Sequence, residues 1–186
     1  ALGAIRPSTG EVLAAASGTA GGGVSTATTG MYAPGSTFKI VTSLALLRSG
    51  LNAGSPLDCS AEAVVDGRGF VNYPDYPSGK IGQISLTDVI ANSCNTALIN
   101  ASGQVTQADL ASAGEALGLG LAQQPGPGVF TGSVPADAEG TEHAASMIGQ
   151  GQVQASPMAM ATVAASVAAG TTVRPTFLAQ EADPVE

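Results

Sequence analysis

A serine and a lysine three residues apart, Ser36 and Lys39, form a pair of side chains that could do covalent chemistry. Residues three apart lie on the same face of a helix, so the Lys39 amine could reach the Ser36 hydroxyl. Phe38 and Ile40 flank the lysine, and a lysine kept from water loses part of its preference for the charged form. A neutral amine is a base that can take the proton of a serine nucleophile, so the pair predicts an acyl-transfer site.

The same spacing also occurs in ordinary helices, where a lysine buries its aliphatic stem and keeps its ammonium group in water. Against this, the chain has only 6 lysine and arginine residues among 186, and an amphipathic surface helix would place Lys39 among polar neighbours. Pro34 and Gly35 supply a tight turn that leads Ser36 to the positive end of the helix dipole. The catalytic and the structural interpretation of Lys39 both stay open on these residues alone.

A second polar group, Ser93-Cys94-Asn95, interrupts an apolar stretch further along the chain. It follows a short helix that we expect to begin at a capping box over residues 85–88, where Ser85 and Asp88 would pair with backbone N–H groups. Ser-x-x-Lys with Ser-Asp-Asn and Lys-Thr-Gly is the motif set of class A β-lactamases and penicillin-binding proteins. The first two elements of that set occur here in the same order.

With these motifs the chain resembles the transpeptidase domain of penicillin-binding proteins. Residues 1–14 resemble its opening hairpin, residues 31–39 its nucleophile segment, and residues 148–151 with 156–161 its late helix. The resemblance implies a mixed α/β (α+β) fold of the penicillin-binding-protein/β-lactamase type. It combines a helical subdomain with a sheet to which this chain contributes mainly the N-terminal hairpin. We therefore expect residues 1–186 to be one transpeptidase domain.

The sequence departs from the family pattern at the third motif, because it contains no Lys-Thr-Gly triplet. Lys80, the only lysine after Lys39, is followed by isoleucine and does not form the motif. By resemblance, the motif strand and its neighbours in the sheet would follow Glu186. We expect these C-terminal strands to be missing, so that residues 1–186 alone acylate slowly and expose apolar surface, since a two-stranded sheet is marginal by itself.

The resemblance also implies a role for each residue of the first two motifs. Ser36 would be the nucleophile and Lys39 the base that activates it. Ser93 would carry a proton between Lys39 and the leaving amine, and Asn95 would hydrogen-bond Lys39 and the amide of the bound peptide. The backbone N–H of Ser36 would form half of an oxyanion hole, in which one donor is worth roughly 3–4 kcal/mol of transition-state stabilisation. No cofactor and no metal are implied.

We therefore predict a serine D,D-transpeptidase that crosslinks the bacterial cell wall during growth or division. It would act on peptidoglycan stem peptides ending in D-Ala-D-Ala through an acyl-enzyme on Ser36, and β-lactams would acylate it. A cell-wall synthesis complex would be a further partner. A β-lactamase shares the serine and lysine but needs an added carboxylate near the site; no glutamate of this chain has an obvious claim to that place, and Glu115 stays open. The same residues would also suit a β-lactam sensor, and a noncatalytic envelope scaffold could keep the fold without the reaction.

Few residues of the chain suit other types of catalysis. A Ser-His-Asp triad would need the single histidine, His143, beside a serine, whereas its neighbours predict a solvated helix start. Cys59 and Cys94 are too few for a structural zinc site; they either pair, as an oxidising compartment allows, or stay two separate buried thiols. Asp137 and Glu139 are expected only to solvate a loop.

Composition narrows the partners and the location. A net charge of −8 without a basic run argues against nucleic acid. The chain is 44% hydrophobic, enough for one sizeable core, but no stretch approaches the length needed to cross a bilayer. The resemblance implies an extracytoplasmic protein of the bacterial envelope, anchored in the membrane through a segment outside this chain.

The elements expected to position these residues begin with a hairpin of residues 1–5 and 11–16 and a flexible loop over residues 18–30. The remaining expectations are a helix over residues 38–48, short extended pieces over 51–84, a capped helix over 106–117, irregular structure over 125–140, and a late helix over 158–169.

Overall fold

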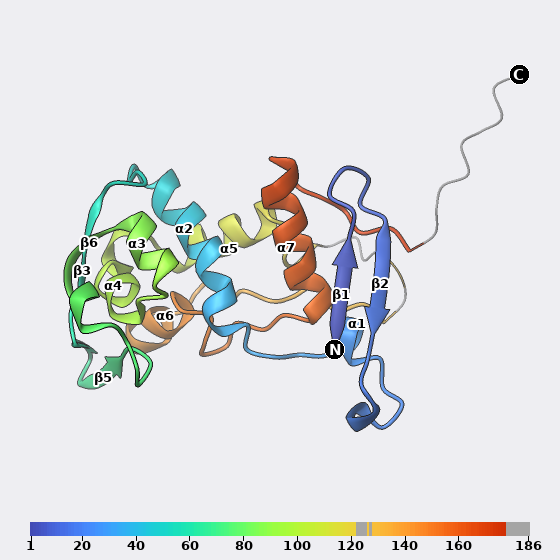
Figure 1. The fold of residues 1–186 in the computed structure, drawn as a ribbon, viewed down its shortest axis with the longest axis horizontal. Coiled ribbons are helices and arrows are strands. Elements are labelled where there is room, and N and C mark those ends of the chain that lie inside the picture. The colour runs from blue at the N-terminus through green and yellow to red at the C-terminus, as the bar shows by residue number, and fades with distance from the viewer. Residues whose placement is uncertain (122–125, 127, 178–186) are drawn as a thin grey trace, which may run out of the picture. The chain divides into compact units, whose positions relative to one another are not determined.

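A computed structural model of the chain describes residues 1–121, 126 and 128–177 (Figure 1). The chain divides into two compact units. The first comprises residues 1–31, 116–132 and 155–186, and the second comprises residues 32–115 and 133–154. Helices and short antiparallel hairpins alternate along the described residues, which confirms the mixed α/β expectation.

In the first unit, β1 (Leu2–Ile5) and β2 (Val12–Ala16) form the expected antiparallel hairpin. The turn between the strands contains Gly10, whose φ of 77° lies in the left-handed region and where a side chain would collide with the carbonyl oxygen of Arg174. Within the described residues the hairpin pairs with itself and gains one parallel bridge, between Glu11 and Thr176.

Two helices accompany the hairpin in this unit: α1 (Thr26–Thr29) and α7 (Pro157–Ala169). The late helix is confirmed, because the Ser156 side chain accepts from the Ala159 N–H at 3.0 Å and Gly170 ends the helix in the left-handed conformation. The loop predicted over residues 18–30 is wrong in part. It contains a 3₁₀ turn and α1, whose residues Ala27 and Thr28 are buried.

The second unit contains five helices among its described residues: α2 (Lys39–Arg48), α3 (Leu86–Ala91), α4 (Asn95–Asn100), α5 (Gln107–Ala116, its last residue in the first unit) and α6 (Gly140–Ser146). The short extended pieces are confirmed as two antiparallel pairs. In one, β3 (Pro56–Cys59) pairs with β6 (Gly82–Ser85); in the other, β4 (Glu62–Val65) pairs with β5 (Arg68–Val71).

Of the two capping boxes read from the sequence, the one at Thr106 forms in full and the one at Ser85 forms by half, because the Asp88 carboxylate accepts from the Ser85 hydroxyl and from Lys80 in place of the Ser85 N–H. The Ser85 side chain accepts from the Asp88 N–H at 3.1 Å and begins α3. At the start of α5, the Thr106 hydroxyl accepts from the Asp109 N–H at 3.2 Å, and the Asp109 carboxylate accepts from the Thr106 N–H at 2.7 Å. Residues 128–139 lie outside helices and named strands as expected, Gly140 already begins α6, and Pro125 lies outside the described residues.

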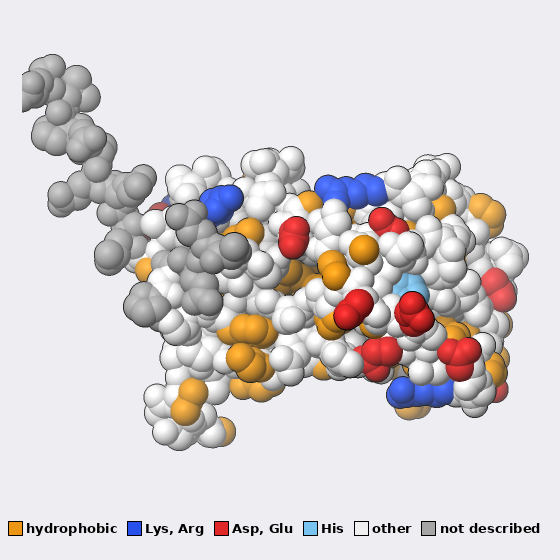
Figure 2. All heavy atoms as spheres, turned by 180° about the vertical axis from the view of Figure 1, so that it is seen from behind, with side chains coloured by type: hydrophobic (Ala, Val, Ile, Leu, Met, Phe, Trp, Pro, Cys, Tyr) orange, Lys and Arg blue, Asp and Glu red, His pale blue; other side chains and the backbone are white. Residues whose placement is uncertain are grey.

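The setting predicted for His143 is wrong. Its Nδ1 lies 2.7 Å from the side-chain oxygen of Gln107, and its Nε2 lies 3.0 Å from the carbonyl oxygens of both Ser102 and Val105. The ring is half-buried and ties α6 to the segment that leads into α5. Acidic side chains lie around the His143 ring on the surface (Figure 2). The exposed Asp137 and Glu139 line one surface pocket together with His143.

No helix in the described ranges is both long enough and apolar enough to cross a membrane.

Candidate active site

The serine of the first motif lies in a 3₁₀ turn, Gly35–Phe38, that leads directly into α2. In such a turn residues three apart eclipse one another, so Ser36 and Lys39 still face the same side, although the α-helix begins at Lys39 and not at Phe38. Ser36 is exposed, whereas Lys39 has only 2% of its surface exposed. An accessible hydroxyl is therefore followed by a buried amine.

A glycine far along the chain shapes this turn. The N–H of Gly35 donates to the carbonyl oxygen of Gly149 at 2.8 Å. Gly149 has a φ of 69°, and a side chain there would collide with the Gly35 carbonyl and the Phe38 side chain. Residues 148–151, which we expected to belong to the late helix, instead form a turn after α6 that packs against the nucleophile turn.

Lys39 is surrounded by three oxygen acceptors from the second motif. Its Nζ donates to the carbonyl oxygen of Ser93 at 2.7 Å, to the Ser93 hydroxyl at 2.8 Å and to the side-chain oxygen of Asn95 at 2.7 Å. Ser93 adopts a φ of 54°, unusual for a residue with a side chain, and both of its oxygens face the lysine. Burial lowers the pKa of Lys39 from 10.5 to about 8.

The Ser93 hydroxyl lies between the lysine and the proposed nucleophile. It donates to the Ser36 hydroxyl at a distance of 3.0 Å. In the part of the chain that the structure describes, no hydrogen bond joins Lys39 to Ser36 directly, so the direct contact expected from the three-residue spacing is replaced by a two-step path.

Two residues that sequence reasoning missed hold Asn95 in place. The carbonyl oxygen of Val71, the last residue of β5, accepts from the Asn95 side-chain NH₂ group at 3.0 Å. The side-chain oxygen of the next residue, Asn72, accepts from the Asn95 backbone N–H at 2.7 Å. No local pattern marks either residue, because both meet the motif through the β4–β5 hairpin.

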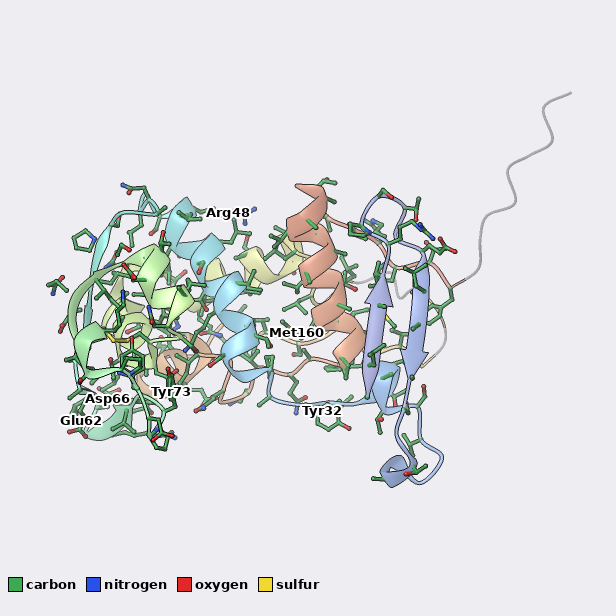
Figure 3. All side chains as sticks on the ribbon, in the orientation of Figure 1. Tyr32, Arg48, Glu62, Asp66, Tyr73 and Met160 are labelled. Atoms are coloured by element: carbon green, nitrogen blue, oxygen red, sulfur yellow. A yellow bond between two sulfur atoms is a disulfide. The ribbon has the colours of Figure 1, made fainter. Side chains whose placement is uncertain are left out.

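A disulfide bond joins Cys59 to Cys94, 35 residues apart (Figure 3), which settles the choice that the sequence left open. Cys94 sits between Ser93 and Asn95, so the bond ties the second motif to the end of β3. The Cys94 sulfur also accepts from the Ala97 N–H at 3.3 Å and caps α4. The loop that faces Lys39 is therefore fixed covalently and by hydrogen bonds.

The other candidate residues lie outside this network. Glu115 is exposed on α5, and His143 contacts no serine hydroxyl. Asp137 and Glu139 make no hydrogen bond with the four motif residues. Among the described residues no group of three or more His, Cys, Asp or Glu side chains could hold a metal ion.

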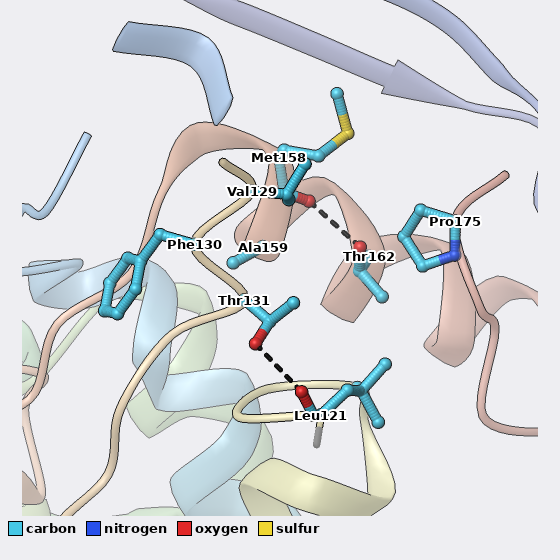
Figure 4. Close-up of a pocket in the computed structure, with 9 residues that line it drawn as sticks. Leu121, Val129, Phe130, Thr131, Met158, Ala159, Thr162 and Pro175 are labelled. Carbon is cyan, nitrogen blue, oxygen red and sulfur yellow. Dashed lines mark hydrogen bonds between the residues drawn. The ribbon is translucent and has the colours of Figure 1, made fainter. Parts of the chain in front are cut away.

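The first unit has a small cavity of its own, lined by Leu121, Val129, Met158 and their neighbours (Figure 4). Thr131 and Thr162 at its wall donate to the carbonyl oxygens of Leu121 and Met158, so their hydroxyls are already satisfied. With a volume of about 10 Å³, the cavity has room for one water molecule at most. It offers no site for a substrate.

The four motif residues can carry a proton from Ser36 to Lys39. A neutral amine has two N–H donors and one lone pair. The Ser93 carbonyl and the Asn95 side-chain oxygen can take the two donors, which leaves the lone pair facing the Ser93 hydroxyl. The hydrogen bonds from Lys39 to Ser93 and from Ser93 to Ser36 have the directions of the ammonium form. With Lys39 neutral, the Ser93 hydroxyl turns to donate to Lys39 and accepts from Ser36, so it can pass its proton to Lys39 as it takes the proton of Ser36.

Comparison with known proteins relates this geometry to a family. The family model described as penicillin binding protein transpeptidase domain matches residues 1–185. The peptidoglycan D,D-transpeptidase PbpA of Mycobacterium tuberculosis is 34% identical over 149 residues, which cover 77% of this chain and 30% of that protein. PbpA of Mycolicibacterium smegmatis is 30% identical over 146 residues, covering 74% of this chain and 28% of that protein. The chain thus spans less than a third of the length of these relatives.

Solved structures show the same likeness. The imipenem acyl-enzyme complex of penicillin-binding protein A from M. tuberculosis superposes with a TM-score of 0.79 at 27% identity, over 90% of this chain and 45% of that chain. Pseudomonas aeruginosa PBP2 in complex with WCK 5153 superposes with a TM-score of 0.80 at 23% identity, over 98% of this chain and 51% of that chain. The second likeness, at its lower identity, concerns the fold alone.

Proposed function

The chain belongs to the family of penicillin-binding protein transpeptidase domains, and from that membership we propose that it forms the acylating part of a serine D,D-transpeptidase of peptidoglycan. The observation that carries the proposal is the hydrogen-bonded path from Ser36 through Ser93 to a buried Lys39. All four residues needed for acylation belong to one unit of the chain.

Acylation begins with Lys39 as a neutral base. A pKa of about 8 leaves roughly a tenth of the lysine neutral at pH 7. Lys39 takes the proton of Ser93 while Ser93 takes that of Ser36, and the Ser36 oxygen attacks the carbonyl carbon of the penultimate D-Ala. The backbone N–H of Ser36, in the first turn of its helical segment, has no partner within that segment and can donate to the developing oxyanion.

Collapse of the tetrahedral intermediate breaks the peptide bond. The proton held by Lys39 returns through Ser93 to the departing amine, and the terminal D-Ala leaves. An ester of the remaining peptide stays on Ser36. A second peptide amine then attacks this ester, loses a proton through the same path and forms the crosslinking amide, which restores the Ser36 hydroxyl. The Asn95 side chain, already bonded to Lys39, would also contact the bound peptide.

β-lactams would acylate Ser36 in the same way, because the strained lactam presents a carbonyl in place of the peptide bond. The proposal draws support from the imipenem acyl-enzyme of the M. tuberculosis relative. A β-lactamase would need a carboxylate to speed deacylation, and Glu115 is not bonded to the site. We place the protein in the cell envelope, anchored outside this chain and working with other enzymes of cell-wall synthesis.

Labelling with a fluorescent penicillin tests the proposed acylation of Ser36. The experiment uses the protein expressed from its whole gene. We expect one label per chain, and Ser36→Ala should abolish it. Ser49→Ala is the matched control, since Ser49 follows the far end of α2 and its hydroxyl bonds only the Leu46 carbonyl. Equal labelling of the Ser36→Ala variant and the parent would refute the assignment of the nucleophile.

A further inference from the structure

The orientation of one amide group decides whether Lys39 has an acceptor. The Asn95 side chain ends in an oxygen and an NH₂ group, which exchange places when the amide group is turned over. Only the oxygen can accept from Lys39. The Val71 carbonyl takes the NH₂ group at 3.0 Å, which leaves the oxygen 2.7 Å from the lysine. The end of β5 thus selects the orientation that the proton path requires.

The residue after Val71 holds the backbone of the same segment. The Asn72 side-chain oxygen accepts from the N–H groups of Asn95 and Thr96, at 2.7 and 3.2 Å. These are the first two N–H groups of α4, which have no partner within the helix. A side chain 23 residues earlier in the sequence therefore fixes the backbone from which Asn95 extends.

Asn72 is itself held rigidly. Its NH₂ group lies 3.3 Å from the Thr96 hydroxyl and 3.4 Å from the Ser60 carbonyl oxygen. The Thr96 hydroxyl also donates to that Ser60 carbonyl, at 2.7 Å. Asn72 is half-buried, and the three groups form a closed set of hydrogen bonds beside the disulfide. Such a support can hold a side chain to the tolerance that catalysis needs.

We propose that Asn72 is a positioning residue for acylation: together with the Val71 carbonyl it fixes Asn95 so that the Asn95 oxygen faces Lys39 and the lysine lone pair faces Ser93. This inference rests on the proposed function, because it gives Asn72 its role through the Ser36 reaction. The described residues place no ionised partner against Lys39, whose pKa is lowered by burial alone. The Asn95 oxygen, which Asn72 helps to hold, is one of three neutral acceptors of the Lys39 ammonium group, and losing a hydrogen bond to the charged form disfavours that form.

The test compares acylation rates of fluorescent penicillin across pH for two asparagine variants of the whole-gene protein. Asn72→Ala should lower the second-order rate constant about tenfold to hundredfold, the cost of misplacing a reacting group by a fraction of an ångström to an ångström. It should also move the midpoint of the pH profile. Asn100→Ala is the control. Asn100 ends α4, the helix that Asn95 begins, and its NH₂ group bonds the Asp58 carbonyl and the Ser60 hydroxyl at 2.9 and 3.0 Å, without contacting Lys39 or Asn95. The control should keep the parent's rate and midpoint.

Asn72→Asp serves as a second variant should Asn72→Ala fail to fold. Aspartate keeps an oxygen for the two N–H groups and adds a negative charge, which favours the ammonium form of Lys39. The midpoint should therefore move to higher pH. The plateau rate should fall, though less than in Asn72→Ala, because aspartate cannot donate to the Ser60 carbonyl that anchors the Asn72 NH₂ group.

A parent-like rate and midpoint in Asn72→Ala, or a parent-like plateau rate in Asn72→Asp, would overturn the positioning role. The Ser36→Ala variant separates the two proposals. If it still takes up label, the proposed function fails; if it does not while Asn72→Ala matches the parent, only the role of Asn72 fails.

Discussion

The two lysines of the chain occupy opposite environments within the same unit. Lys39 is 2% exposed and bonded to three uncharged acceptors, and burial lowers its pKa to about 8. Lys80 ends a 3₁₀ turn, is half-exposed and donates to the Asp88 carboxylate at 2.8 Å, and this hydrogen bond and the charge of Asp88 raise the pKa of Lys80. The same side chain is thus a base in one region and a surface cation in the other, because only one is buried without a counter-charge.

Exchanging each lysine for arginine should separate the two regions most strongly. Lys39→Arg should lower the penicillin acylation rate by about 10²- to 10⁴-fold, the range for losing a general base, since guanidinium stays charged. Lys80→Arg should react like the parent, because arginine can also pair with the exposed Asp88. Single-turnover labelling kinetics measure both. A Lys39→Arg rate within a few-fold of the parent would make Lys39 a mere positive charge.

Removing the disulfide should destabilise the fold through the loop that faces Lys39. The bond closes a loop with a sequence separation of 35, for which the chain-entropy relation gives about 4 kcal/mol of stabilisation. The variant with both Cys59→Ala and Cys94→Ala should lose free energy of unfolding of this order, measured by urea titration. A loss below about 1 kcal/mol would mean that hydrogen bonds such as those of Asn72 hold the loop without the bond.

The pH dependence of stability should have opposite sign for the two lysines. The folded pKa of Lys39, about 8, lies below its unfolded value of 10.5, so the unfolded state binds more protons between these values and Lys39 makes stability rise with pH there. Lys80 has a raised folded pKa, so its contribution is present below pH 10.5 and is lost as pH rises through the folded value.

Urea unfolding between about pH 8 and pH 10 checks this. Lys39→Met should flatten the rise, and Lys80→Met should leave it unchanged over the same range. A rise that persists undiminished in Lys39→Met would contradict the lowered pKa.

The smallest effect should come from Asp88→Asn, which removes the charge that pairs with Lys80. Exposed ion pairs contribute little and are screened by salt. We expect a slight fall in the melting temperature at low salt, a smaller one at high salt, and an unchanged acylation rate. A marked loss of acylation would mean that the Lys80 region also acts on the site.

Features governed by neighbouring residues were predictable from the sequence. The helix caps at Ser85 and Thr106, and Ser156 with Gly170 around α7, depend on residues within three or four positions of the backbone they satisfy. That the two serine motifs belong to one site was expected from the family resemblance, whereas the direct Lys39–Ser36 contact expected from spacing is replaced by the path through Ser93. The helix α1 was missed, because the run of Thr and Ala around it carries no strong helix signal.

Contacts between distant segments were not predictable. His143 was misjudged because its partners Ser102, Val105 and Gln107 come from another segment. Asn72 looks like an ordinary loop asparagine until the β4–β5 hairpin brings it to Asn95. The position of the Ser93 hydroxyl between Ser36 and Lys39 likewise follows from a left-handed backbone at Ser93 that no motif spacing indicates.

The pH profile of acylation tests the central claim, that a buried neutral Lys39 receives the proton of Ser36 through Ser93. With the whole-gene protein and a penicillin in excess, the second-order rate constant should rise with pH through a midpoint near 8, the pKa to which burial lowers Lys39. A profile that is flat across this range, or one that rises only near the ordinary lysine value of 10.5, would contradict the account.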